Sequence, residues 1–288
     1  MNHPWSKLEI ILLTVLAALL GLAFWGPSVV QPASQHDFAD QRLLWGIPFA
    51  RDVLSNLSFA LWGLLGIGCL ARQWRTAHQS GPERSAVSAS QYRMAALFFT
   101  GLLLTAAGSG YYHWQPDDAG LVPDRLGMAV AYAGLLGLAA GGRISARAGV
   151  ALALAVLVFG PVSVGVWAVT GNVTPWLVLQ FGGLALVLWL ACLQPLQGAL
   201  AVRWGSVILI YTLAKLLELG DHWVYEMAGH AVSGHSLKHL VASCAAWPVL
   251  VVLMALRGGP KSGQNPVHKP GARHAKKSSN KRSLTHER

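Results

Sequence analysis

Charged side chains are scarce in this sequence. Asp, Glu, Lys and Arg make up 12% of its 288 residues, whereas hydrophobic residues make up 53%; an ordinary soluble domain is about 25% charged. The apolar residues fall in long runs, without the short alternating stretches that a membrane β-barrel needs. A bilayer core about 30 Å thick takes roughly 20 apolar residues as a helix. The composition therefore excludes a soluble globular protein and predicts an all-α, polytopic transmembrane bundle.

Cysteine is also scarce. Cys69, Cys192 and Cys244 each lie inside an apolar stretch, and no pair of them has the CxxC spacing. This pattern excludes a disulfide framework and a structural zinc ribbon. We expect the three cysteines to be small apolar packing residues.

Eight apolar segments are expected to span the membrane, at residues 8–26, 52–71, 93–112, 124–142, 147–169, 175–194, 204–222 and 235–256. The first belongs to an N-terminal anchor over residues 1–30, although Lys7, the apolar stretch after it and the small residues near Ala33 also fit a cleaved signal peptide. The other seven form a core over residues 31–256. The basic tail, residues 257–288, cannot bury a core and is expected to be disordered.

The formal net charge of +10 would suit a nucleic-acid partner, but the position of the charges argues against one. Lys and Arg gather in alternate loops and in the tail, which is how membrane proteins keep cations on the cytoplasmic side. We therefore expect no nucleic-acid partner and two cytoplasmic termini. The short loops suggest a bacterial inner membrane, with the acidic loops on the periplasmic side.

Three short pieces of sequence carry candidate chemistry: Gly108–His113, Pro123–Arg125 and Ser233–His239. His235 and His239 are four residues apart, so they share one helix face, and Ser109 and His113 have the same spacing. In the expected topology all three pieces lie at the non-cytoplasmic face. Three imidazoles from two helices can then converge, and three histidines with an open fourth position are typical of a catalytic zinc site.

Asp124 and Ser109 complete this predicted site. Zinc lowers the pKa of bound water to about 7, Asp124 is the natural acceptor of that water's proton, and Ser109 can hydrogen-bond the water or a developing oxyanion. Two alternatives stay open on the residues alone. The histidines could be polar caps at the headgroup level, and His222 or His230, near the same face, could be an alternative ligand.

These pieces resemble the alkaline ceramidase family and its wider membrane-hydrolase superfamily, which includes the adiponectin and progestin receptors. That pattern is Ser-x3-His, then Asp on the next helix, then His-x3-His on the last. The similarity extends to Ala39–Arg42, Asp52–Asn56 and Ala214–Asp221, and it covers roughly residues 37–256.

The resemblance implies a seven-helix core that holds Zn²⁺ through His113, His235 and His239. The implied reaction is hydrolysis of the amide of ceramide, or of a related N-acyl lipid, to a fatty acid and an amine. The expected partner is a membrane lipid substrate, and no protein partner is implied. A non-catalytic lipid receptor or sensor on the same scaffold is the alternative, and a transporter that uses charged residues of the seventh span is a third.

The sequence departs from the family pattern at an N-terminal calcium site. Eukaryotic members resemble one another in a site rich in Glu, Asp, Trp and Asn. Here Asp40, Asp52 and Asn56 remain, but Gln41 and Leu43 stand where Trp and Glu are expected. The chain thus keeps only part of a Ca²⁺ site, and Asn56 and its neighbour Ser55 are expected instead to cap or bridge helices.

Several other charged residues lie within or beside the predicted spans. Lys215 and Glu218 can pair across one helical turn, and with Asp221 they form either a structural network or a grip on a lipid headgroup. Arg125 could bind a headgroup or Asp117. Lys238, between the last two histidines, is expected to point away from them and snorkel to the surface.

Overall fold

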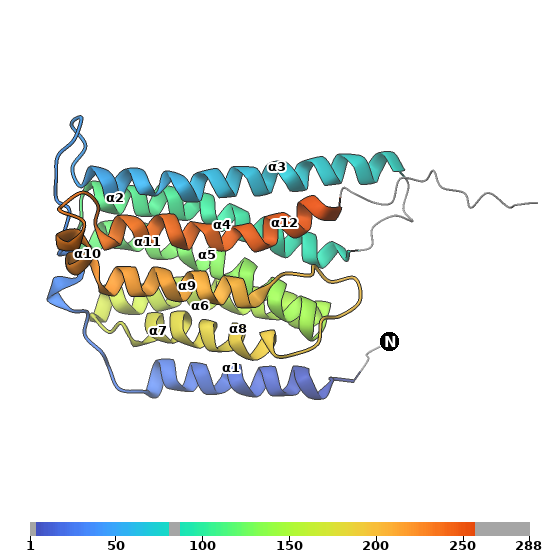
Figure 1. Cartoon of the computed structure of the whole chain (residues 1–288). Coiled ribbons are helices and arrows are strands. Elements are labelled where there is room, and N and C mark those ends of the chain that lie inside the picture. The colour runs from blue at the N-terminus through green and yellow to red at the C-terminus, as the bar shows by residue number, and fades with distance from the viewer. Residues whose placement is uncertain (1–3, 81–86, 257–288) are drawn as a thin grey trace, which may run out of the picture. The chain divides into compact units, whose positions relative to one another are not determined.

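The computed structural model describes residues 4–80 and 87–256; the tail predicted at 257–288 lies outside them. The described residues form helices and no β-strand, with two isolated bridges. The elements (Figure 1) are α1 (Lys7–Trp25), η1 (Ala33–His36), α2 (Ala50–Ser55), α3 (Leu57–Ser80), α4 (Ala89–Trp114), α5 (Asp118–Arg143), α6 (Ala146–Thr170), α7 (Thr174–Leu177), the π-helical turn η3 (Val178–Gly182), α8 (Gly183–Ala191), α9 (Trp204–Leu219), α10 (Asp221–Met227), α11 (Gly234–Ser243), η4 (Cys244–Ala246) and α12 (Trp247–Ala255).

Seven helical segments in the described part of the chain are long and apolar enough to cross a membrane. They confirm the all-α transmembrane bundle, and they match seven of the eight expected spans with ends shifted by a few residues. The remaining expected span, the seventh in order at 204–222, corresponds to α9. This helix has 16 residues, so it is about 24 Å long, shorter than a bilayer core. The chain turns at Gly220 and continues as α10.

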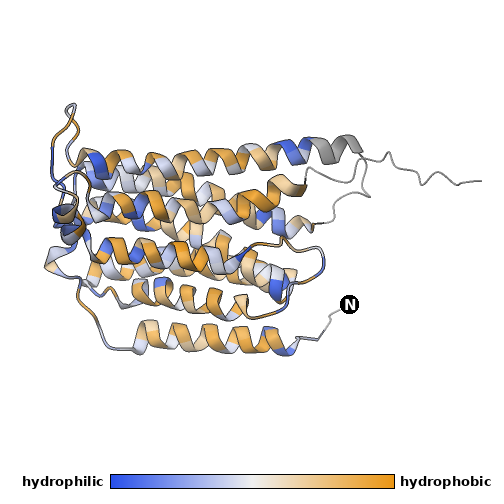
Figure 2. Ribbon diagram, viewed as in Figure 1, coloured by the Kyte–Doolittle hydropathy of each residue, from blue (hydrophilic) through white to orange (hydrophobic). Residues whose placement is uncertain are grey.

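Hydropathy follows the helix axes (Figure 2): hydrophobic residues occupy the length of the bundle, and hydrophilic ones gather toward its ends. The helix α1 joins the bundle through polar contacts at both ends. Near its start, the buried Glu9 carboxylate accepts hydrogen bonds from Arg147 and Ser145 of the α6 N-terminus, at 2.7 Å each. Just beyond its end, the Val29 amide donates to the Thr174 hydroxyl at 2.9 Å.

Helices α4 and α5 pack closely because small residues line their contact. A Cβ added at Gly108 of α4 would collide with the backbone of Pro123, and one at Gly127 of α5 would collide with the backbone of Leu104. Small residues at such crossings let helix backbones approach. The close crossing at Gly108 brings the following residue, Ser109, next to Asp124.

The functional pieces of the sequence meet at one end of the bundle. Helix α4 ends there, whereas α5 and α11 begin there, at the end opposite the start of α1 (Figure 1). The expectation that the three pieces share one end is therefore met.

Candidate metal centre

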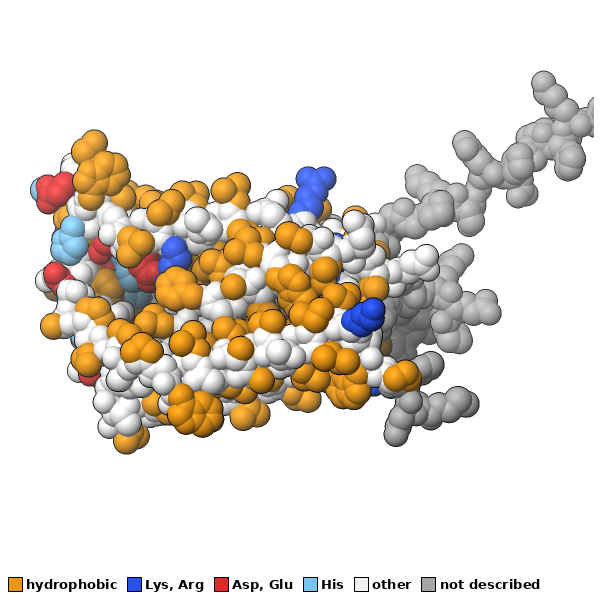
Figure 3. Space-filling model, turned by 90° about the horizontal axis from the view of Figure 1, so that it is seen from below, with side chains coloured by type: hydrophobic (Ala, Val, Ile, Leu, Met, Phe, Trp, Pro, Cys, Tyr) orange, Lys and Arg blue, Asp and Glu red, His pale blue; other side chains and the backbone are white. Residues whose placement is uncertain are grey.

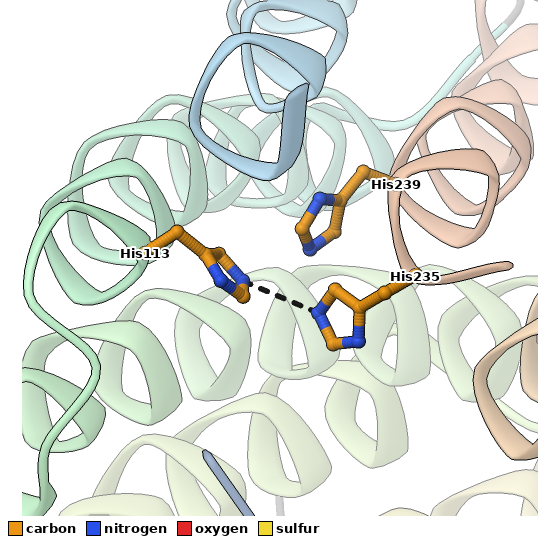
Figure 4. Close-up of side chains that lie close together, drawn as sticks. All are labelled: His113, His235 and His239. Atoms are coloured by element: carbon orange, nitrogen blue, oxygen red, sulfur yellow. Dashed lines mark hydrogen bonds between the residues drawn. The ribbon is translucent and has the colours of Figure 1, made fainter. Parts of the chain in front are cut away.

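His113, His235 and His239 converge from two helices (Figure 4). His113 lies in the last turn of α4, and the other two lie in the first turns of α11. All three are buried, and one ligand atom from each lies within 4.8 Å of the others. The ring centroids are 4.8–4.9 Å apart. Among the described residues, these histidines form the group that could hold a metal ion.

The spacing of one pair of imidazole nitrogens matches that around a small tetrahedral ion. His113 Nε2 lies 3.2 Å from His235 Nε2. Zn–N bonds of about 2.0–2.1 Å in tetrahedral geometry place two ligating nitrogens about 3.3 Å apart. The donor set of three neutral imidazoles suits Zn²⁺ and also other transition metals such as Cu, Fe and Ni.

A hydrogen-bond chain sets the tautomer of His239. Its Nδ1 lies 2.8 Å from the Ser55 hydroxyl, and that hydroxyl donates its single proton to the backbone carbonyl of Asp52 at 2.9 Å. Ser55 must therefore accept from His239, so Nδ1 carries the proton and the lone pair of the neutral ring is on Nε2. Supporting hydrogen bonds of this kind are what metal-ligating histidines make.

Lys238 turns into the site, and the expectation that it points away is wrong. Its Nζ lies 3.0 Å from His235 Nε2 and 3.1 Å from Glu218 Oε1. Residues three apart on a helix are neighbours on its surface, so Lys238 shares a face with His235. Because an ammonium is only a donor, His235 Nε2 accepts this bond, so the lone pair of the neutral ring is on Nε2.

Buried carboxylates fix the first turn of α11. Ser233 caps the helix, accepting from the Ser236 amide at 3.0 Å, and Asp52 of α2 accepts from the hydroxyl of Ser236 at 2.5 Å. Asp221 accepts from the backbone amide of His235 at 2.7 Å. These contacts tie α11 to α2 and α10, and they determine where His235 lies.

An aromatic ring from the loop before α2 covers the histidines. Phe38 is buried, and its ring centroid lies 4.7 Å from that of His113 and 4.5 Å from that of His235, both edge to face. The adjacent Ala39 amide donates to Asp221 at 3.0 Å. The Asp221 carboxylate therefore holds the cover and the ligand helix together.

A cavity of about 120 Å³ lies between α4, α5, α9 and α11, with His239 in its wall. Its polar lining residues include Ser109, Asp124 and His239, and the Ser109 hydroxyl hydrogen-bonds the Asp124 carboxylate. Apolar side chains line most of the remainder. Figure 3 shows acidic, basic and histidine side chains gathered in a hollow near one end of the molecule, framed by hydrophobic surface.

Lys215, Glu218 and Lys238 form a charged network on the cavity wall. The Glu218 carboxylate binds both ammonium groups, Lys215 at 2.5 Å and Lys238 at 3.1 Å. All three are partly exposed. Ionisable residues within a membrane span are costly and are most often functional. Asp221, grouped with them by sequence spacing, instead binds backbone amides.

Arg125 lies apart from the cavity lining. Its guanidinium stacks 4.0 Å above the Trp167 ring and donates to Gln31 Oε1 at 2.7 Å. These contacts bridge α5, α6 and the segment after α1. Asp117 is not among the contacts of Arg125, whereas a headgroup contact stays a prediction.

The residues expected to form part of a calcium site have separate partners. The Asp40 carboxylate binds the Arg42 guanidinium through both oxygens, at 2.6 and 2.5 Å, whereas Asp52 binds serines of α11. Asn56 donates to the Asp52 carbonyl at 2.8 Å. Ser55 bridges α2 to α11, as expected. Burial raises the pKa of Asp40, but the hydrogen bonds and charge of Arg42 outweigh it, and the pKa lies below its usual value.

His222 and His230, the alternative ligands, lie outside the centre. His222 is exposed beside Asp37, and His230 is exposed beside Glu226. Neither belongs to the metal-binding group.

Neither a family model nor a curated protein matches the chain. The interpretation of the site therefore rests on its motifs and geometry. Sequence reasoning missed the cover, Phe38, and the orientation of Lys238. The spacing of three residues between His235 and Lys238 was a signal for the orientation of Lys238. A phenylalanine in a loop, such as Phe38, carries no comparable signal.

Proposed function

We propose that this chain is a zinc-dependent integral-membrane hydrolase that cleaves the amide bond of ceramide, or of a related N-acyl lipid, to a free fatty acid and an amine. The observation that carries the proposal is the convergence of three buried imidazoles beside a cavity lined by Ser109 and Asp124. Its motif pattern also resembles that of the alkaline ceramidases.

The surroundings of the cavity suit a lipid substrate. Its polar lining lies near one end of the bundle, and apolar side chains continue toward the bundle's centre. The amide of a two-tailed lipid lies just below the headgroups. Its polar linkage would therefore meet the polar lining, and its acyl chain would meet the apolar lining. By the distribution of cations, the proposed orientation has cytoplasmic termini and a periplasmic site in a bacterial inner membrane.

The chain's own residues have defined tasks in this reaction. Zinc, when bound by His113, His235 and His239, supplies a Lewis acid and lowers the pKa of water to about 7. Asp124 accepts a proton from the attacking water and delivers it to the amide nitrogen as the C–N bond breaks. Once Asp124 has taken the proton, the Ser109 hydroxyl no longer donates to that carboxylate and can donate to the carbonyl oxygen, together with Lys238, as negative charge develops there. The water oxygen ends in the fatty acid and its proton on the amine.

Lipid mass spectrometry of cells with and without the protein tests the substrate class. Cells with active protein should have a higher ratio of free fatty acid to one N-acyl lipid. The Asp124→Asn variant should abolish that change, with turnover reduced by about 10²–10⁴-fold, the usual contribution of a general acid–base residue. Asp118→Asn, at an exposed carboxylate in the first turn of the same helix, is the matched control and should keep activity.

Metal analysis of the same variants separates an enzyme from a receptor. With the histidine-containing tail removed, the purified wild type and Asp124→Asn should both bind about one zinc per chain. A receptor would respond to its ligand equally well with either residue at position 124. Unaltered lipid ratios in the presence of zinc-loaded wild type would overturn the hydrolase proposal.

A further inference from the structure

A second cavity adjoins the one beside the histidines and shares lining residues with it. It measures about 50 Å³ and lies between α5, η3, α8 and α9, with mostly aliphatic lining residues such as Leu184, Val187 and Ile208. The two cavities share four lining residues: Tyr132, Leu135, Tyr211 and Ala245. The shared residues are thus a partition between a reaction cavity and an apolar one.

Two tyrosines carry the polar part of this partition. Tyr132 of α5 and Tyr211 of α9 lie hydroxyl to hydroxyl at 3.1 Å, with ring centroids 6.4 Å apart. The Tyr132 hydroxyl also hydrogen-bonds Gln180 of η3. Phenol hydroxyls placed among apolar side chains need partners, and here each hydroxyl is the other's partner. The pair therefore bridges two helices across the path between the cavities.

The depth of this pair suits an acyl chain. Tyr132 is eight residues beyond Asp124 on α5, and Tyr211 is seven residues before Glu218 on α9. At 1.5 Å per residue both lie about 10–12 Å from the level of the reactive groups, toward the bundle's centre. Between these levels the cavity wall consists largely of apolar residues, including Met128, Ala131 and Ala214.

We propose that the Tyr132–Tyr211 pair ends the acyl-chain pocket and sets the fatty acyl length that the protein accepts. The inference rests on the proposed function, since it takes the amide beside the histidines as the fixed end of the substrate. A chain that reaches the tyrosines fills the first cavity. A longer chain has to displace their rings to enter the second cavity, and so it loses the hydrogen bond between them.

Substitution at Tyr211 separates the bulk of the ring from its hydroxyl. Tyr211→Ala removes the ring and joins the cavities, so kcat/KM for long-chain relative to shorter-chain N-acyl lipids should rise about tenfold or more, the discrimination that a single methylene gives in an apolar pocket. Tyr211→Phe keeps the ring but removes the hydroxyl–hydroxyl bond, so it should shift the chain-length preference much less than Tyr211→Ala does. Tyr92→Ala is the control, because Tyr92 packs partly buried on α4 and lines neither cavity.

Binding of the product class provides a readout that does not depend on turnover. Saturated fatty acids of increasing length, bound to the purified zinc-loaded protein, should show an affinity optimum that moves to longer chains in Tyr211→Ala. Thermal unfolding and zinc content identify a variant that has failed to fold, in which case Tyr132→Ala makes the same test from α5. An unchanged optimum in a folded alanine variant overturns the acyl-length proposal. Failure of the proposed function is a different result: no N-acyl lipid is hydrolysed by the wild type.

Discussion

Two sets of residues in this chain resemble metal ligands, and the structure treats them differently. The three histidines lie on two helices and present nitrogen atoms to one point. The set of Asp40, Asp52 and Asn56 lies close together in sequence, yet Arg42 binds one carboxylate and serines bind the other. Proximity along the chain is therefore a poorer guide to a shared ligand than the direction in which helices present their side chains.

Removing one ligand from each set should give the largest contrast. His235→Ala should weaken zinc binding by more than the 10–100-fold that loss of a supporting hydrogen bond costs, and it should abolish lipid hydrolysis. Asp40→Asn should leave both unchanged. Zinc content by elemental analysis, alongside turnover, measures the contrast. Full zinc occupancy in His235→Ala would disprove the assignment of the histidine centre.

A smaller effect should come from the hydrogen bond that sets the tautomer of His239. Ser55→Ala removes the acceptor of its Nδ1 proton, so zinc affinity should fall about 10–100-fold. Ser243→Ala is the control: this serine is also buried, on α11 itself, but it bonds a carbonyl of its own helix. Competition with a metal-binding dye measures both affinities. Equal values would mean that Ser55 has no part in presenting His239.

The smallest effect should come from pH at Asp40. Its carboxyl has a folded-state pKa below the ordinary 3.8, so its contribution to stability is present above about pH 4 and is lost as the pH falls through the folded value. Because Arg42 is partly exposed, the contribution should be less than about 1 kcal/mol. Unfolding in detergent at neutral and acid pH checks this, and Asp40→Asn should lose the corresponding part of the pH dependence.

The positions of the long helices were largely predictable, because they follow from the lengths of the apolar segments in the sequence. Seven spans were identified with small shifts at their ends. The exception is α9, which ends at Leu219. The chain turns at Gly220, before the polar residues that were expected to end the span. A local glycine turn in an apolar helix has no composition signal, since glycine is common throughout these spans.

The candidate site was predictable where spacing along one helix determines the result. His235 and His239, and Ser109 and His113, share faces through four-residue spacing. The meeting of Ser109 with Asp124 required the topology and the close crossing at Gly108. The spacing of three residues already places Lys238 beside His235, and the ion pair with Glu218 of α9 then holds its ammonium in the site, away from the expected snorkelling position.

The two bonds of Asp221 have a mechanical consequence. One oxygen holds the amide of His235 and the other holds the amide next to Phe38. One carboxylate therefore joins the loop that carries Phe38 to the start of α11. A molecule that displaced Phe38 would therefore also pull on the backbone of His235, one of the three residues that could hold a metal ion.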